Sequence, residues 1–125
     1  MLTLDLQSRV PIYRQIENGI ITLILLDVWP EGSRLPSVRS LAAQLNTNPN
    51  TVQKAYQELE GWGVIASAAG RGSFVQQRQA AQEVLRRQAV QSLEEAARQA
   101  ALAGISRQEA GQILSGAWPE KEETP

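Results

Sequence analysis

Cationic and amide side chains gather in one stretch of the chain that contains no acidic residue. Between Gly32 and Gln57 there is no Asp or Glu, although the formal net charge of the 125 residues is −1. The polar side chains of interest in this stretch are Arg34, Ser37, Arg39, Asn48, Asn50, Thr51, Gln53 and Lys54. Arginine and lysine bind phosphate oxygens, and Asn and Gln can form two hydrogen bonds with the edge of a base. The distribution of charge therefore indicates a nucleic-acid ligand.

The chain contains few residues suited to catalysis or metal binding. The chain has no cysteine and no histidine, which excludes disulfides, thiolate nucleophiles, zinc fingers and the commonest general base. The acidic residues of the first sixty positions form no catalytic motif with a Ser, Thr or Lys; they are Asp5, Asp27, Glu31, Glu58 and Glu60. We therefore predict no catalytic residue, no metal and no cofactor, and a cytoplasmic protein without a signal or membrane segment.

The polar residues are expected to lie on a helix-turn-helix. Apolar residues recur every three or four positions in three segments, the first beginning at Pro11. Ser37 is a helix-capping residue before the second, and Asn46 can adopt the left-handed conformation of a tight turn. Asn48 then precedes a third predicted helix, Pro49–Gly61. In such a motif the start of the last helix enters the major groove of DNA.

Two short strands, 64–67 and 73–75, are predicted after the three helices, and this order is that of a winged helix. The intervening tip contains Gly70, Arg71 and Gly72, whose glycines can take positive φ angles. A small cationic tip can reach a minor groove or its phosphates. The same tripeptide is also compatible with a simple tight hairpin, so its position after the helix-turn-helix carries the functional interpretation.

The individual side chains differ in how strongly they point to DNA. Gln53 and Lys54 lie one turn into the third helix and away from its apolar stripe, whereas Asn48 and Thr51 are equally explained as capping and turn residues. Arg39 has no carboxylate within four residues, which excludes a local helix ion pair and favours a phosphate contact. Arg34 is expected in a loop, where a phosphate contact and a plain surface role stay open.

The composition changes after Gln76 towards Ala, Gln, Glu and Arg, and predicts a separate helical segment. Its long helix carries an apolar stripe, and a second helix begins at Ser106 with Glu109 as a capping box. We predict that this segment forms a dimer interface through Leu85, Ala89, Leu93, Ala96, Ala100, Ile105, Ile113 and Leu114. The helix could instead fold back on its own winged domain. A membrane-surface role is disfavoured by the mixed charges of its polar face.

Four ordered motifs together resemble one known family. They are RLPSVRSLA at 34–42, NPNTVQKAYQELE at 48–60, GVI at 63–65 and GRGSFV at 70–75. The stretch from Pro11 to Val75 closely resembles the GntR family of bacterial regulators, and the short helical C-terminus looks like its YtrA subfamily. Three positions depart from the family pattern: Asp27 for a glycine, Ser40 for a glutamate and Thr47 for a valine. We expect these to alter local stability more than function.

The resemblance implies a mainly α (α+β) protein with two parts: residues 1–75, a winged helix-turn-helix with a two-stranded wing, and residues 76–125, a two-helix dimerisation segment ending in a frayed acidic tail. It also implies that Arg39, the start of the third helix and the wing tip contact double-stranded operator DNA. The function expected is that of a homodimeric repressor on a palindromic operator. Members of this subfamily are often associated with transporter operons, and no small-molecule effector is identified.

A winged helix can also serve as a protein-binding adaptor, because fold alone does not fix function. A protein-docking surface usually exposes aromatic or apolar anchors. The outward side chains of the third helix are instead Asn50, Gln53, Lys54 and Gln57. DNA binding is therefore the preferred interpretation, and the adaptor is the alternative.

Overall fold

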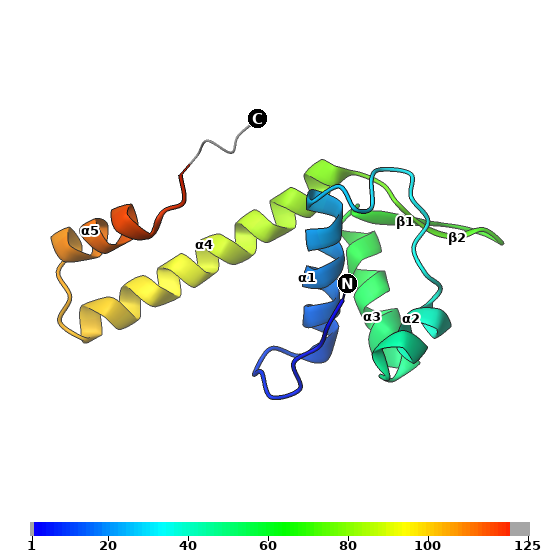
Figure 1. The fold of residues 1–125 in the computed structure, drawn as a ribbon, viewed down its shortest axis with the longest axis horizontal. Helices are drawn as coiled ribbons and strands as arrows, with labels where there is room; N and C mark the ends of the chain where they lie inside the picture. The colour runs from blue at the N-terminus through cyan, green and yellow to red at the C-terminus, as the bar shows by residue number, and fades with distance from the viewer. Residues whose placement is uncertain (1, 121–125) are drawn as a thin grey trace. The chain divides into compact units, whose positions relative to one another are not determined.

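The computed structural model of the chain describes residues 2–120. Its helices and strands are, in chain order, α1 (Ile12–Leu25), α2 (Val38–Leu45), α3 (Pro49–Gly61), β1 (Ile65–Ala68), β2 (Gly72–Val75), α4 (Arg78–Leu102) and α5 (Arg107–Ala117). Three helices followed by a hairpin and two further helices confirm the predicted fold class (Figure 1). The acidic tail predicted to be frayed lies, apart from Glu120, outside the described residues.

The chain divides into two compact units, residues 1–86 (unit 1) and residues 87–125 (unit 2). The predicted boundary falls after Val75, earlier than this division. Ala81 and Val84, in the first two turns of α4, are buried in unit 1 at 0% and 5% exposure. The winged domain thus includes the beginning of α4 in its own core.

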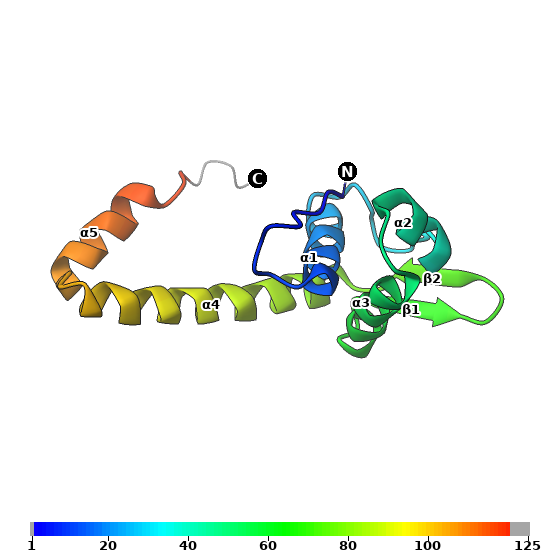
Figure 2. The same cartoon turned by 90° about the horizontal axis from the view of Figure 1, so that it is seen from below.

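The core of unit 1 forms where α1, α2 and α3 pack together. α1 and α3 lie side by side, and α2 packs on α3 (Figures 1 and 2). α1 supplies branched side chains at three- and four-residue spacing, which places Ile16, Ile20 and Ile24 on one face. Leu41 of α2 and Leu59 of α3 are also buried. This single core holds the two helices of the helix-turn-helix in place.

Polar side chains fix the ends of these helices as the sequence predicts. Ser37 Oγ accepts a 3.0 Å hydrogen bond from the amide of Ser40 at the start of α2. Asn46 ends that helix with φ +53, the left-handed conformation that makes the tight turn. Asn48 Oδ1 accepts a 2.8 Å hydrogen bond from the amide of Asn50 and so caps α3.

The wing is an antiparallel hairpin whose register pairs Ile65 with Val75 and Ala68 with Gly72. Arg34, expected in a loop, instead forms a β-bridge with Phe74. The amide of Leu35 also donates to Ser73 O at 2.8 Å. The segment before α2 therefore pairs with the hairpin through a short bridge. The sequence pattern of the hairpin alone could not predict this pairing.

Residues 2–10 form no strand, although Leu2, Leu4 and Leu6 alternate with other residues as in a strand. Without a partner strand, their backbone pairs with a side chain instead: Gln15 Nε2 donates to Asp5 O at 3.0 Å, and the amide of Asp5 donates to Gln15 Oε1. Leu2 lies against Gly19 of α1, where a Cβ atom would clash with its side chain. This lead-in segment is thus packed onto α1.

Unit 2 has no buried core of its own in the single chain. None of the residues 87–120 is buried, and Trp118, at the end of α5, is 66% exposed. α5 turns back alongside the C-terminal part of α4, and Ser106 Oγ accepts a 3.1 Å hydrogen bond from the amide of Glu109 at its start. Among the described residues, no helix has the length and apolar character needed to cross a membrane.

Candidate nucleic-acid interface

The start of α3 presents polar side chains to solvent. Asn50, Gln53 and Lys54 are exposed, while Val52 and Ala55 in the same turns of α3 are fully buried. Thr51 is half-buried. Asn48 is engaged as the helix cap, which supports the alternative that its role is structural. The side chains available to a ligand at this helix end are therefore Asn50, Gln53 and Lys54.

Lys54 is held against an aromatic ring of another helix. Its Nζ atom lies 4.4 Å from the centroid of the Tyr13 ring in α1. A cation over an aromatic face is stabilised by the ring quadrupole, by about 0.5–1 kcal/mol at an exposed site. This contact limits the conformations of Lys54, and Tyr13 is a residue that the sequence interpretation did not include.

A second contact fixes α3 relative to the segment before α2. The hydroxyl of Tyr56 donates a 2.6 Å hydrogen bond to Pro36 O, and burial raises the pKa of this phenol above its usual range. The hydroxyl therefore stays protonated and remains a donor. Since Pro36 directly precedes the cap of α2, this bond ties the two helices of the motif together.

Arg39 and Ser37 lie at the beginning of α2. Both are exposed, and among the described residues Arg39 takes part in no ion pair. The Ser37 oxygen already accepts the capping hydrogen bond, so that its hydroxyl proton is what it can offer a ligand. An exposed guanidinium without an acidic partner has its donors available for phosphate.

The wing carries Arg71 in its turn and is joined by Arg34, which pairs with Phe74 of β2. A Cβ atom built on Gly72 would come within 3.2 Å of Arg34 Nε, so the glycine makes room for the Arg34 side chain. Gly70 and Gly72 have φ of +74 and +93, and Arg71 between them is exposed. The predicted tip residues thus form the turn, and Arg34 joins them as part of the wing.

A buried carboxyl group lies behind this surface, between α1 and α3. Glu17 is fully buried, and its Oε1 is 3.0 Å from Arg14 Nε in an ion pair without hydrogen-bond alignment. Burial first, and then the neighbouring Glu58 of α3, raise the pKa of Glu17 to about 8, although Arg14 lowers it. The sequence interpretation did not include Glu17; the signal available was helical spacing, because Glu17 lies four residues before Ile21, which the structure shows to be buried.

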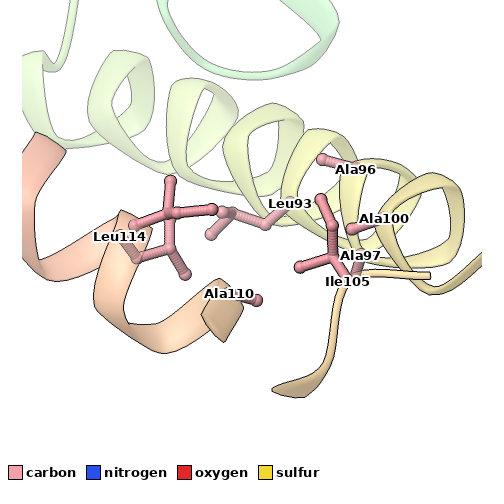
Figure 3. A pocket seen from close by; sticks show the side chains of 8 residues that line it. Leu93, Ala96, Ala97, Ala100, Ile105, Ala110 and Leu114 are labelled. Atoms are coloured by element: carbon pink, nitrogen blue, oxygen red, sulfur yellow. The ribbon is translucent and has the colours of Figure 1, made fainter. Parts of the chain in front are cut away.

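Unit 2 carries a different surface, an apolar groove of about 220 Å³ between α4 and α5. Figure 3 shows the side chains that line it, which come from both helices and the turn between them. They are Leu93, Ala96, Ala97, Ala100, Ile105, Ala110, Ile113 and Leu114. Six of the eight residues predicted for a dimer interface meet here. The other two, Leu85 and Ala89, are exposed on α4 and do not line the groove.

A helix-turn-helix followed by a β-hairpin wing defines the class of winged helix-turn-helix proteins. Within that class, the family model described as "Bacterial regulatory proteins, gntR family" matches residues 12–75. This match spans half of the chain, and the protein belongs to the GntR family. The resemblance inferred from the sequence motifs is thereby confirmed.

Several known proteins are similar to this chain. The HTH-type transcriptional repressor YtrA of Bacillus subtilis is 45% identical over 75 residues, which are 60% of this chain and 58% of YtrA. The solved GntR family transcriptional regulator from Listeria monocytogenes superposes with a TM-score of 0.74 at 29% identity, covering 90% of this chain and 99% of that one. YtrA and two further curated relatives are matched over about three fifths of their length.

A second similar structure contains bound DNA. It is the DNA-binding domain of AraR in complex with operator ORR3, with a TM-score of 0.52 and 26% identity. The match covers 58% of this chain and 87% of that domain. The similarity therefore concerns the winged helix-turn-helix alone.

Proposed function

We propose that this protein is a sequence-specific DNA-binding transcription regulator that acts as a homodimeric repressor on a palindromic operator. The observation that carries the proposal is the polar start of α3, where Asn50, Gln53 and Lys54 are exposed on a helix whose opposite face is anchored in the core. Amide and ammonium groups at this position suit the acceptor-rich edges of bases in the major groove. The operator complex of a similar winged domain supports the same use.

The remaining cations have a positioning role in this proposal. Arg39 at the start of α2 binds a phosphate where that helix crosses the backbone, and Arg34 and Arg71 of the wing bind phosphates or the minor groove. Such contacts fix the orientation of the domain without carrying sequence information. Base selectivity is then the work of Gln53 and Asn50, and Lys54 is restricted by its contact with Tyr13.

The dimer is proposed to form through the apolar groove of unit 2. Leu93, Ile113 and Leu114 are 46%, 54% and 44% exposed, and no residue from 87 to 120 is buried. A two-helix hairpin without a buried core gains too little from burial to offset the entropy of ordering it. A second copy presents the same apolar stripe with the same small alanines, so a two-fold interface buries both at once.

The proposal is tested by selecting bound fragments of bacterial genomic DNA with the full-length protein, followed by mobility shift on the recovered sequence at moderate salt. We expect a palindromic site bound at least a thousandfold more tightly than random duplex, and lower expression of an adjacent reporter gene. Transporter operons are the first genes to inspect, given the subfamily resemblance. Equal affinity for all sequences would reject the proposal and leave the adaptor alternative.

A further inference from the structure

Two helix ends meet where α4 begins, and one arginine connects them. Arg78, the first residue of α4, donates from Nη2 to Leu25 O, the last residue of α1, at 2.7 Å. Its own amide donates to Glu31 Oε2 at 2.9 Å. Its Nε lies 3.6 Å from Asp27 Oδ1. Residues about fifty positions apart in sequence are thus joined within unit 1.

The two hydrogen bonds each satisfy a backbone group that a helix leaves unpaired, and the ion pair with Asp27 adds a contact between side chains. The last carbonyls of a helix and its first amides have no partner inside the helix. Arg78 places a cation at the carboxyl end of α1, and Glu31 places an anion at the amino end of α4, so both charges also match the helix dipoles. The joint, as we call the side chains of Asp27, Glu31 and Arg78, therefore closes both helix ends with three residues.

Asp27 carries a carboxylate at a position whose backbone conformation suits glycine. Its φ is +61, in the left-handed region, and apart from Asn46 it is the one described non-glycine residue with positive φ. Asp tolerates this region better than most residues, but glycine adopts it without strain. The side chain that accompanies the strained backbone is directed to Arg78.

We propose that the joint of Asp27, Glu31 and Arg78 restricts how α4 swivels on the winged domain and thereby makes the dimer selective for the spacing between operator half-sites. The inference rests on the proposed function, because only a dimer can measure spacing. α4 is one helix from Arg78 to Leu102, so its first turn is the place where rotation would begin. Adding one base pair between half-sites shifts them by about 3.4 Å and rotates one about the DNA axis by about 34°. A stiff joint resists that change.

The buried residues of the same segment explain why three surface contacts are enough. Ala81 and Val84 hold one side of the first turns of α4 in the core of unit 1. Single exposed ion pairs contribute little to stability. The joint need not stabilise the fold, because it has only to remove the remaining rotation at the end of the helix.

The test uses full-length protein and an operator selected by it from a random-sequence duplex library. Duplexes with one to three base pairs inserted between the half-sites are then compared. We expect the unmodified protein to lose roughly thirtyfold in affinity for a two-base-pair insertion, and Arg78→Ala to lose only about threefold. Arg87→Ala removes the same charge from an exposed site of α4 and should keep the spacing profile of the unmodified protein.

Sedimentation and thermal unfolding must show that Arg78→Ala is a folded dimer. If it is not, Asp27→Asn is used instead, because asparagine tolerates the left-handed conformation. This variant should broaden the spacing profile in part. A folded dimeric variant with the unmodified spacing profile would overturn the joint and leave the proposed function intact. If the unmodified protein selects no paired half-sites, the proposed function itself is wrong, and the inference about half-site spacing fails with it.

Discussion

The two units of this chain differ in how far they bury their apolar side chains within one copy. In unit 1, branched aliphatic side chains of α1, α2 and α3 are almost completely buried within a single copy. In unit 2, alanines dominate the apolar side of α4, and every side chain from 87 to 120 retains contact with solvent. We therefore expect the first unit to fold as a monomer and the second to need the proposed dimer partner to cover its apolar side.

The contrast is clearest in how each unit uses leucine and isoleucine. Ile16, Ile20 and Ile21 are at 0% exposure in unit 1. Ile113 and Leu93 in unit 2 remain about half exposed. Residues of the same hydrophobicity are thus buried in the fold of one region and left about half exposed in the other, where we propose that they form the dimer interface. Four experiments can break or sharpen this distinction.

The largest effect is expected from a charge in the groove of unit 2. Leu93→Glu should convert the dimer to a folded monomer, because an unpaired charge buried at an interface is destabilising by about 3–5 kcal/mol. Analytical sedimentation measures the change, and affinity for a palindromic operator should fall with it. Gln91→Glu, an exposed position of α4 outside the groove, is the matched control. A dimeric Leu93→Glu protein would show that unit 2 associates elsewhere.

Truncation tests whether unit 1 is complete on its own. A chain ending at Arg86 should be a stable monomer, because it keeps the buried Ala81 and Val84. A chain ending at Gln77 loses both, together with the Arg78 contacts, and should be less stable by about 2–4 kcal/mol. Urea denaturation followed by circular dichroism compares the two. Equal stability would place the boundary of the winged domain at the end of the wing.

Because Glu17 is buried in unit 1, we expect pH to change the free energy of unfolding of that unit. Its pKa of about 8 in the folded protein lies above its ordinary value of 4.5, so between these values the folded state retains the proton more strongly. Stability from this group is therefore complete below pH 4.5 and is lost as pH rises through 8. The free energy of unfolding should fall by at most about 1.4 kcal/mol per pH unit in this window.

Denaturant unfolding between pH 5 and 9 measures that slope. Glu17→Gln should flatten it and exceed the unmodified protein in stability at pH 8.5, while Glu83→Gln, at an exposed position of unit 1, should leave it unchanged. An unaltered slope in Glu17→Gln would mean that another group is responsible.

The smallest effects separate base reading from phosphate binding within unit 1. Gln53→Ala should relax preference at particular operator positions by about 1–3 kcal/mol. Arg39→Ala should weaken binding to all sequences alike and reduce the salt slope by about one unit per subunit. Titrations of operator and random duplex at several salt concentrations provide both quantities. If Gln53→Ala weakened the two duplexes equally, Gln53 would have no role in base selectivity.

The sequence predicts the elements of this protein well and its long-range contacts poorly. Helical periodicity and capping residues such as Ser37 and Asn48 act within a few positions, and the corresponding helices are present where predicted. The pairing of Arg34 with Phe74 and of Arg78 with Glu31 joins residues forty or more positions apart. No local pattern contains such information, because it depends on how the finished helices pack.

The candidate site shows the same limit. Residue types and spacing were sufficient to find the polar start of α3, and they also raised the possibility that Asn48 is only a cap. They could not show that Lys54 lies over Tyr13, since the contact crosses from α3 to α1. The DNA-binding roles themselves stay predictions until variants are measured.

The three tryptophans of the chain divide between the two units in a way that supplies optical probes. Trp29 and Trp62 pack against the core of unit 1, and Trp118 is 66% exposed in unit 2. With Trp118 replaced by phenylalanine, the remaining emission reports on the winged domain alone. With Trp29 and Trp62 replaced instead, the single indole of Trp118 reports on unit 2, and its emission maximum would follow association as the protein is diluted. Unfolding of the winged domain and separation of the subunits of the proposed dimer can thus be observed independently in two tryptophan variants, without attached dyes.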